Sequence, residues 1–535
     1  MKKYMKKKSA VFFGAIISIL LSTVFAVSLQ FIKGDVLDYA VAGDLILVNK
    51  YIWLLFVFII SEILLFFIYK LLSAKFIVGC SKELKNDIFS SIMSHSYVDY
   101  KKSNQGSYIA KYANEADTIV SRYFALIPLF YEIFFKICIV SLALFLLDWR
   151  VAVITLFLLT TPLYLPKLIE KKLQKIQEEQ IKAVSESIEK INDWLSGFEI
   201  IKNFSIEKKI MGKFEVVNDN SAKKFYADIR IGALSQLITT LISYLSYFII
   251  LACSAVLVWK GEFSAGEFFV AIGMVDQLSY PLISLADIIR ELIAIKPICR
   301  KMETFIIKKE KVPYGRKKME LQQQIIVEDV SFSYPEQPLV FEKLNFVFEK
   351  NRRYLIKGPS GCGKTTMINL LLQYYPPITG NIKIDNTPIE QYDSSYDLMT
   401  VVRQEAILFH DSLRNNLTMY QNFDEDIIIK KLVELGLEKY ANKDSLDEIV
   451  EENGSNFSGG EQKRICLARA LLRKTDVLIL DEPLANLDIE TGKKIEDLLL
   501  QITDRTVIIV SHQFTNEKIG LFDNVFNLDA SIGKV

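Results

Sequence analysis

The sequence Gly-Pro-Ser-Gly-Cys-Gly-Lys-Thr-Thr at residues 358–366 constrains the fold of this chain more than any other segment. It contains the pattern G-x-x-x-x-G-K-[ST], and it lies between an apolar run at 353–357 and a helical run at 366–372. Glycines let backbone N–H groups turn onto phosphate oxygens, and a helix N-terminus favours anions. The flanked motif therefore predicts a strand, a phosphate-binding loop and a helix.

This loop is expected to bind the phosphates of a nucleotide. We expect Lys364 to reach the β- and γ-phosphates and the Thr365 hydroxyl to bind Mg²⁺. The residues expected to contact the nucleotide here are Gly358, Pro359, Ser360, Gly361, Cys362, Gly363, Lys364, Thr365 and Thr366. A chance glycine-rich turn is the alternative, and the correct flanks disfavour it.

Two carboxylates stand at the end of a second apolar run, at residues 476–482. A short continuous apolar run is typical of a buried parallel strand, and open α/β sheets bind ligands at the carboxyl ends of their strands. We therefore expect Asp481 to contact Mg²⁺, either directly or through one of its ligands, and Glu482 to act as the general base on a water. A solvated strand end is the alternative, but the spacing from the phosphate loop suits a nucleotide-binding sheet.

A third apolar run, at residues 506–510, ends in Ser511 and His512. The chain has only 3 histidines, so a histidine at a strand end is informative. His512 could hold the γ-phosphate and the attacking water in place. A lone histidine at such a position is more often structural, and the sequence alone leaves both readings open.

The segment Phe-Ser-Gly-Gly-Glu-Gln at 457–462 resembles the signature sequence of the ATP-binding cassette (ABC) transporter family, with Phe and Glu in place of the usual Leu and Gln. The resemblance implies that two cassettes face each other, and that each ATP lies between one chain's phosphate loop and the other's signature. The expected signature contacts are Ser458, Gly459, Gly460 and Glu461. These residues would open a helix, which supplies a second anion-binding end.

Other motifs resemble those of the same family and occur in its order. Tyr334 resembles the aromatic residue that stacks on adenine, and Gln404 resembles the Q-loop glutamine that senses Mg²⁺ and the membrane domain. The segments 452–454 and 485–488 resemble the X-loop and the D-loop, and His512 resembles the switch histidine. The resemblance implies an α/β P-loop cassette over residues 325–535 that uses ATP and Mg²⁺, with Thr365, Gln404 and Asp481 around the metal.

The first part of the chain is apolar enough to cross a membrane several times, although charged residues make up 24% of the whole. The predicted spans, each of about 18 or more mostly apolar residues, are 10–32, 50–72, 125–147, 151–169, 231–258 and 265–294. Lysines in residues 1–8 predict a cytoplasmic N-terminus by the positive-inside rule. A signal peptide is the alternative, but the apolar stretch is long and lacks a clear cleavage site.

The segments between the spans set the expected topology. The acidic segment 34–38 and the short turn Asp148-Trp149-Arg150 suit the outside. The long, lysine-rich segments 73–124 and 170–230 suit the cytoplasm, and their periodicity suggests helices that extend beyond the membrane. The segment 296–324 has little apolar periodicity and is expected to be a linker.

This layout resembles an exporter-type ABC half-transporter, with an all-α six-helix transmembrane domain at 1–295 followed by the cassette. The resemblance implies coupling helices near 100–108 and 204–213, and a second half-transporter as partner. A homodimer is favoured, and a heterodimer with a related chain is the alternative. The expected location is the bacterial plasma membrane, with the N-terminus and the cassette in the cytoplasm.

Among the charged residues of the predicted spans, four lie at a similar depth, namely Glu62, Glu132, Lys136 and Asp276. At a rise of about 1.5 Å per residue, all four lie about 17 to 23 Å from the outer surface. Glu132 and Lys136 have the i, i+4 spacing of an ion pair, which leaves Glu62 and Asp276 as an acidic remainder. One hypothesis is a mildly acidic cargo cavity with walls formed by Tyr244, Tyr247 and Tyr280. The alternative is that these charges only pair between helices.

The function predicted from these features is ATP-driven export of an amphipathic cargo, such as a peptide or a lipophilic cationic molecule. A lipid or lipopeptide flippase is the alternative within this class, and an ATP-hydrolysing membrane regulator or sensor is the alternative outside it. A formal net charge of +1 gives no reason to expect a nucleic-acid partner. The 6 cysteines have no metal-binding spacing and are expected to be reduced.

Overall fold

The computed structural model describes residues 1–164, 167–307, 320–335, 337–359, 361–392, 395–485, 487–512 and 514–528. The chain forms two compact units. The first comprises Met1–Ser94 and Ser103–Lys309, and the second comprises His95–Lys102 and Glu310–Val535.

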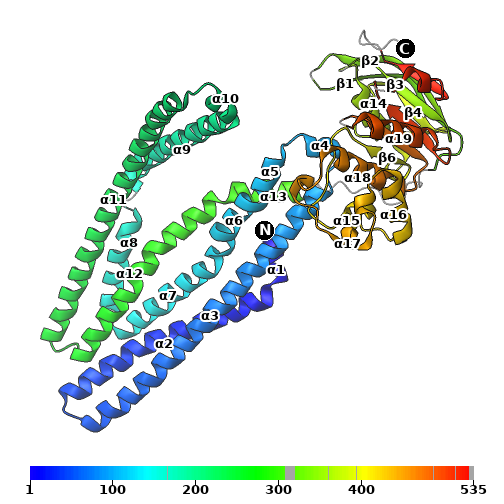
Figure 1. Cartoon of the computed structure of the whole chain (residues 1–535). Coiled ribbons are helices and arrows are strands. Elements are labelled where there is room, and N and C mark those ends of the chain that lie inside the picture. The colour runs from blue at the N-terminus through cyan, green and yellow to red at the C-terminus, as the bar shows by residue number, and fades with distance from the viewer. Residues whose placement is uncertain are drawn as a thin grey trace. The chain divides into compact units, whose positions relative to one another are not determined.

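The described residues of the first unit form helices joined by short turns (Figure 1). Its helices are α1 (Lys2–Lys7), α2 (Ser9–Val41), α3 (Leu45–Met93), α5 (Gln105–Ala110), α6 (Ala116–Ile119), α7 (Leu126–Leu147), α8 (Trp149–Tyr164), α9 (Lys167–Ser196), α10 (Phe198–Asn203), α11 (Glu207–Trp259), α12 (Ala265–Ala294) and α13 (Lys296–Ile307). Side-chain caps start several of them: Asp44 accepts bonds from the N–H groups of Ile46 and Leu47 at α3, and Ser264 forms a capping box with Glu267 at α12.

Four of the described helical stretches are long and apolar enough to cross a membrane: Ser9–Val41, Leu45–Met93, Gln105–Leu147 and Glu207–Trp259. They contain the predicted spans one, two, three and five. The sixth predicted span coincides with α12, and the fourth begins in α8 and covers residues 165 and 166, which lie outside the described residues. Helices α3 and α11 continue for 49 and 53 residues, as the predicted helical extensions require.

The acidic segment 34–38, which the sequence predicts to lie outside, is part of α2, because this helix continues to Val41. The Asp38 carboxylate accepts hydrogen bonds from the Ser264 hydroxyl and the Gly266 N–H, both at 2.6 Å. A side chain at Gly34 would meet Val270 at 2.5 Å, so the helices α2 and α12 approach closely here. The carboxylate therefore lies at the N-terminus of α12, where a negative charge is favourable.

Residues 296–307 are also not part of a linker, because they form α13. The buried side chains of Cys299, Met302 and Ile306 share one apolar cluster with Phe76, Cys80, Leu84 and Ile88 of α3. Their spacing of three and four residues is a helical apolar period that the sequence analysis did not recognise. A short turn is present at residues 148–150 as predicted, since α7 ends at Leu147 and Asp148 accepts bonds from the N–H groups of Arg150 (2.7 Å) and Val151 (3.2 Å).

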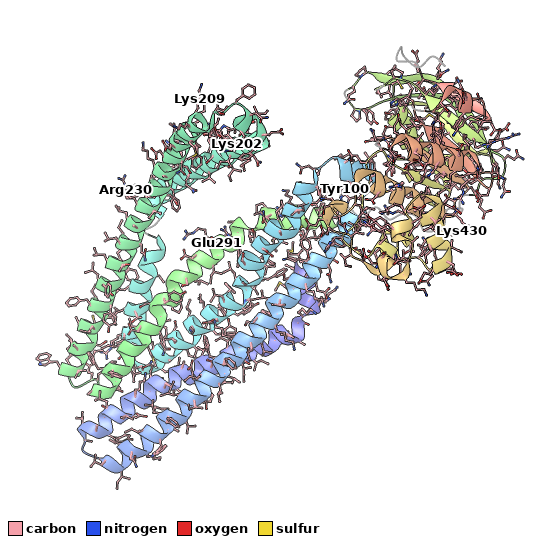
Figure 2. The ribbon with its side chains drawn as sticks, viewed as in Figure 1. Tyr100, Lys202, Lys209, Arg230, Glu291 and Lys430 are labelled. Carbon is pink, nitrogen blue, oxygen red and sulfur yellow. The ribbon has the colours of Figure 1, made fainter. Side chains whose placement is uncertain are left out.

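Two short helices begin a few residues before the segments 100–108 and 204–213, where coupling helices were expected. Helix α4 (Tyr97–Lys101) belongs to the second unit, where the Tyr97 ring stacks on Tyr374 with 3.8 Å between centroids. Helix α10 joins α9 to α11 at the end of a long hairpin (Figure 1). Figure 2 shows Lys202 and Lys209 on this end of the hairpin, and both are exposed.

The second unit contains two sheets. The antiparallel sheet has the order β2 (Leu339–Glu349), β1 (Gln324–Ser333), β4 (Thr379–Ile384) and β5 (Thr387–Pro388). The parallel sheet has the order β6 (Met399–Val402), β7 (Val477–Asp481), β8 (Thr506–Val510), β3 (Arg353–Lys357) and β9 (Asn524–Asn527). The helices of this unit are α4, α14 (Lys364–Leu371), α15 (Leu413–Thr418), α16 (Glu425–Glu434), α17 (Lys443–Asp447), α18 (Gly459–Leu472), α19 (Ile489–Leu500) and α20 (Asn516–Ile519).

The parallel sheet brings the predicted motifs to one edge. Strands β7 and β8 are buried at every position, as their apolar runs predicted. In the register, Asp481 lies beside Val510, and Ile356 of β3 lies beside Val510 on the other side. The carboxyl ends of β7, β8 and β3 therefore place the two carboxylates, His512 and the phosphate loop next to one another.

Candidate active site

The phosphate loop connects β3 to α14 with the backbone that its glycines allow. Gly361 and Gly363 have φ values of +83° and +99°, in the left-handed region that favours glycine. A Cβ on Gly363 would lie 2.6 Å from the Phe341 ring, so this position also lacks space for a side chain. Lys364 Nζ donates to the carbonyls of Gly358 (2.7 Å) and Pro359 (2.9 Å), which folds the lysine across its own loop.

A cavity of about 660 Å³ opens in front of this loop. Its lining contains residues from every predicted catalytic and metal-binding motif: Gly358, Pro359, Gly361, Gly363, Lys364, Thr365, Thr366, Gln404, Asp481, Glu482, Ala485 and His512. The fold therefore gathers segments more than 100 residues apart around one space. Predicted contact Ser360 lies outside the described residues. Cys362 is buried and does not line the cavity, so the structure gives it a packing position.

Glu482 and His512 form a hydrogen-bonded pair that the sequence did not predict. His512 Nδ1 lies 2.8 Å from Glu482 Oε1, and the Ser511 hydroxyl donates to Oε2 at 3.3 Å. Glu482 is buried, whereas 65% of the His512 side chain is exposed. The Glu482 backbone has a φ of +49° and its N–H donates to the Val510 carbonyl at 2.8 Å. This conformation is uncommon for a residue with a side chain, and such residues cluster at active sites.

Asp481 is buried beside this pair at the end of β7. Burial raises the pKa of its carboxyl, Glu482 adds to the effect, and the cations of Arg403, Lys463 and Lys364 oppose it. The Thr365 hydroxyl, the Gln404 amide and the Asp481 carboxylate line the same cavity and offer oxygen ligands. These donors suit Mg²⁺, which binds few protein oxygens and keeps water and phosphate oxygens as its other ligands.

Tyr334 lies next to the helix that follows the phosphate loop. Its hydroxyl is 3.1 Å from the Thr366 hydroxyl, and its ring packs edge-on against Phe332 and Tyr375. Tyr334 does not line the cavity itself. The ring is half-buried and is held in one orientation by these three contacts.

The signature residues begin α18 as predicted, with Ser458 as its N-cap. Glu461 Oε2 accepts hydrogen bonds from the Ser458 N–H and hydroxyl, both at 2.8 Å, and Tyr440 donates to Oε1 at 3.1 Å. Burial opposes the charge, but these bonds outweigh it and lower the pKa of the Glu461 carboxyl. Ser458, Gly459, Gly460 and Glu461 are all absent from the lining of the phosphate-loop cavity of the same chain.

The predicted ion pair inside the membrane spans is present and has a third member. Glu132 is buried, and its carboxylate lies 3.3 Å from Lys136 Nζ and 3.1 Å from Lys70 Nζ. Lys70 Nζ also lies over the rings of Phe66 and Tyr69, 4.8 Å and 4.9 Å from their centroids. Lys70 lies within the predicted span 50–72, but its contact with Glu132 could not be inferred from the sequence, because the two residues are on different helices and 62 positions apart.

The two remaining acids are not joined to this cluster by any hydrogen bond or ion pair among the described residues. Glu62 is half-buried and accepts a 3.5 Å bond from the Ser22 hydroxyl. Asp276 on α12 is exposed in the single chain. The predicted aromatic wall is partly exposed as well, since Tyr244 and Tyr280 are open and Tyr247 is half-buried.

The chain belongs to the ABC transporter family. Residues 9–282 match the ABC transporter transmembrane region, and residues 341–485 match the family described as ABC transporter. The chain is therefore an ATP-hydrolysing transporter of the exporter type. Half-transporters of this family generally dimerise.

Relatives and a solved structure agree with this assignment. The chain is 26% identical over 469 residues to the "Multidrug resistance-like ATP-binding protein MdlB" of Buchnera aphidicola, covering 85% of this chain and 80% of that protein. It is 24% identical over 448 residues to the "ATP-dependent lipid A-core flippase" of Photobacterium profundum, covering 81% and 75%. A bacterial Atm1-family ABC exporter with ATP bound has the same fold, with a TM-score of 0.83 and 19% identity over 99% of this chain and 95% of that chain.

Proposed function

We propose that this exporter hydrolyses ATP with Glu482 as the general base. The strongest support is the position of Glu482, whose carboxylate lines the phosphate-loop cavity together with Asp481 and Lys364. His512 orients this carboxylate through the 2.8 Å contact and reaches the γ-phosphate and the attacking water with the rest of its exposed ring. Lys364 leaves its own loop carbonyls and binds the β- and γ-phosphates, and Tyr334 stacks on the adenine.

Mg²⁺ would be held by Thr365, Gln404 and Asp481. When bound, the ion neutralises charge between the β- and γ-phosphates. The bound ion would also stabilise the ionised form of Asp481, because a nearby cation lowers the free-energy cost of ionising a buried carboxyl. The backbone N–H groups of the glycine loop hold the phosphates on the opposite side.

Glu482→Gln tests the proposed catalytic role. We expect kcat of the ATPase to fall by at least about 100-fold, because an amide cannot accept the proton from water. ATP binding should persist, since the cavity keeps its shape. Glu438→Gln, a change of the same type at an exposed glutamate of the cassette, should leave the rate unchanged. An unchanged rate in the Glu482 variant would contradict the proposal.

We further propose that two copies of this chain form the working transporter. The four signature residues begin a helix with exposed polar groups, yet none lines the phosphate-loop cavity of its own chain. A second copy would supply the missing face of each cavity. This chain also has a general base and a histidine in place, so each copy could complete an active site for the other.

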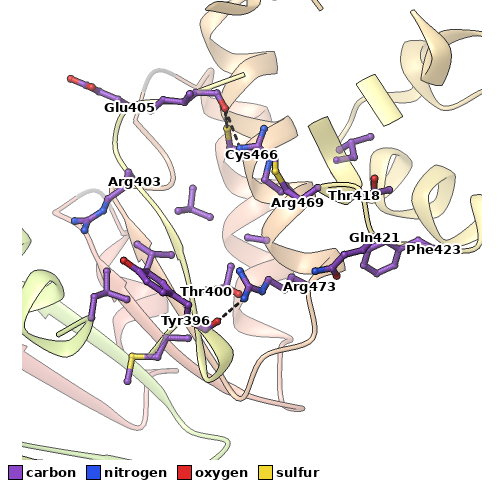
Figure 3. A pocket seen from close by; sticks show the side chains of 18 of the residues that line it. Tyr396, Thr400, Arg403, Glu405, Thr418, Gln421, Phe423, Cys466, Arg469 and Arg473 are labelled. Carbon is purple, nitrogen blue, oxygen red and sulfur yellow. Dashed lines mark hydrogen bonds between the residues drawn. The ribbon is translucent and has the colours of Figure 1, made fainter. Parts of the chain in front are cut away.

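The hairpin of α9, α10 and α11 supports the same proposal. Phe198, Ile200 and Phe204 on and beside α10 are exposed apolar side chains. The cassette has a mostly apolar groove of about 380 Å³ between β6, α15 and α18 (Figure 3), with Tyr396 and Phe423 in its lining. Exposed apolar surfaces of this kind mark docking sites, and we propose that α10 of one copy docks on the cassette of the other.

The proposed cargo is an amphipathic molecule taken up from the inner side. Glu62 and Asp276 carry negative charge within predicted spans and have no cationic partner among the described residues, which would favour a cationic peptide or lipophilic amine. The exposed rings of Tyr244 and Tyr280 offer flat apolar surface for such a cargo.

Lipid flipping is the second candidate, and Lys70 is the observation that favours it. Two ammonium groups share the single carboxylate of Glu132, so the cluster has a net positive charge. Half of the Lys70 side chain is exposed, which leaves it available to an anionic headgroup. The Photobacterium relative is named as a lipid A-core flippase, which is an anionic-lipid precedent among similar proteins.

Two variants separate these candidates when ATPase is measured with added cargo. Glu62→Gln with Asp276→Asn should abolish stimulation by cationic amphiphiles if the acidic residues bind cargo. Lys70→Met should instead abolish stimulation by anionic lipid if the lysine cluster does. Stimulation by neither class in the unmodified chain would favour the membrane regulator.

The proposed orientation places the N-terminus and cassette in the cytoplasm of a bacterial cell, as the lysines of residues 1–8 require.

A further inference from the structure

Lys463 is a buried cation that does not line the ATP cavity. It lies in the first turns of α18, only 4% exposed, and its Nζ donates to the carbonyls of Gln404 (2.7 Å) and Arg403 (3.2 Å). Burying an ammonium costs free energy even when it is hydrogen-bonded, and an apolar side chain of the same length would avoid that cost. Packing alone therefore does not explain a lysine here.

The two carbonyls belong to the loop that carries Gln404 into the ATP cavity. The Gln404 side chain lines that cavity together with Asp481 and Glu482. On its other side, the loop is fixed by the Arg403 guanidinium, which donates to Asn369 Oδ1 of α14 at 2.8 Å. Figure 3 shows Arg403 and Glu405, the neighbours of Gln404, on the loop that follows β6. The loop is thus held between the helix of the phosphate loop and the helix of the signature.

We propose that Lys463 is a positioning residue that transmits movement of the signature helix to Gln404. The inference rests on the proposed dimer, in which the start of α18 receives the ATP bound by the opposite chain. α18 is a continuous helix from Gly459 to Leu472, so a pull on Ser458 moves Lys463 with it. The 2.7 Å bond then moves the Gln404 backbone within its own ATP cavity. Each chain would thereby couple the two ATP sites through one side chain.

A double-mutant cycle in the full chain, reconstituted in lipid nanodiscs, tests this. Lys463→Met keeps the length of the side chain and removes its donors. We expect kcat to fall by about 10- to 100-fold, as for a small misplacement of a catalytic group, with KM for ATP little changed and the Hill coefficient for ATP reduced towards one. Lys463→Gln retains a hydrogen-bond donor, so kcat and the Hill coefficient should both be partly recovered in this variant. Lys430→Met, at an exposed lysine labelled in Figure 2, should change neither.

The cycle distinguishes positioning from general support of the fold. If Lys463 acts through Gln404, then Lys463→Met should have no further effect on a Gln404→Ala chain. Additive losses in the double variant, or an unchanged Hill coefficient in Lys463→Met, would overturn the proposal. Loss of folding is checked by thermal unfolding of each variant.

Amide hydrogen exchange provides a readout that needs no turnover. In the full-length Lys463→Met chain, the amides of residues 403–407 should exchange faster than in the unmodified chain, while those of α14 should not change. Equal exchange at 403–407 would overturn the inference. An inactive unmodified chain would instead contradict the proposed homodimer, and the exchange result would still decide the role of Lys463.

Discussion

The charged residues of the cassette and those of the membrane unit differ in how they are paired. In the cassette, Glu482 is bonded to His512 and Ser511, and Asp481, the other carboxylate of the cavity, lies beside it at the end of β7. In the membrane unit, Glu132 is paired twice, whereas Glu62 contacts a serine and Asp276 is exposed. The hydrolytic groups are therefore assembled within one chain, and the charges proposed for cargo are not.

This difference follows from the two kinds of fold. A parallel sheet places the carboxyl ends of neighbouring strands side by side, so a few apolar runs bring their terminal residues together. Long helices have no such edge, and a charged side chain on one helix meets a partner only where two helices cross. A cargo site between helices is then complete only when all the helices that surround it are present.

Gly363→Ala should have the largest effect and would test the cassette side of the comparison. A Cβ at this position lies 2.6 Å from Phe341, and the φ of +99° is strained for alanine. We expect ATP affinity to fall by about 100-fold, measured by nucleotide binding to the full chain. Gly492→Ala is the matched control, because nothing lies within 4 Å of its Cβ and it stands in helix α19. Equal effects of the two changes would mean that loop geometry does not limit binding.

Glu132→Gln should have the next largest effect and tests the membrane side. Removing the carboxylate leaves Lys70 and Lys136 close together without a counter-ion, so we expect a loss of about 2 kcal/mol in stability. Glu62→Gln makes the same change where no ion pair exists among the described residues, and should cost less than about 0.5 kcal/mol. Unfolding in detergent measures both. Similar losses of stability in the two variants would show that the ion pairs of Glu132 do not stabilise the membrane unit, and would contradict the distinction drawn between Glu132 and Glu62.

His512→Ala should lower kcat by about tenfold, because the hydrogen bond that orients the charged Glu482 is lost. Ser511→Ala removes the longer 3.3 Å bond to the same carboxylate and should lower kcat by about threefold. Steady-state ATPase of the full chain measures both variants. A larger loss for Ser511→Ala than for His512→Ala would contradict the assignment of His512 as the main orienting group.

Glu461→Gln should have the smallest effect. The change removes a negative charge from the helix end that is proposed to face the partner's ATP, so ATP affinity should rise by about two- to fivefold. The amide oxygen of glutamine can still accept the bond from the Ser458 N–H, which preserves the helix start. Binding measured on the assembled transporter would detect the change, and weaker binding would show that the carboxylate supports the site.

Much of the cassette could be predicted from the sequence because its motifs are local. The glycine pattern of 358–366 and the apolar runs before Asp481 and His512 each specify a short segment, and the parallel sheet joins them. The Glu482–His512 contact joins residues 30 positions apart, and it could have been inferred only by placing β7 beside β8.

The contacts that the sequence did not reveal are tertiary ones without a local pattern. Lys70 meets Glu132 from another helix, and Lys463 meets the Gln404 loop across 59 residues. Asp38 looks like a solvent-facing acid in the sequence, and its contact with the start of α12 is known only from its bonds to Ser264 and Gly266. Helix α13 was assigned to a linker because the segment 296–324 as a whole has little apolar periodicity, although Cys299, Met302 and Ile306 are spaced to face α3.

The most direct test of the central claim is the ATPase activity of this chain alone, purified into lipid nanodiscs beside the Glu482→Gln variant. The account predicts hydrolysis by the unmodified chain and its loss in the variant, since two copies would complete two active sites. Binding of ATP without hydrolysis by the unmodified chain would contradict the homodimer. Equal hydrolysis by both chains would contradict the assignment of Glu482 as the general base.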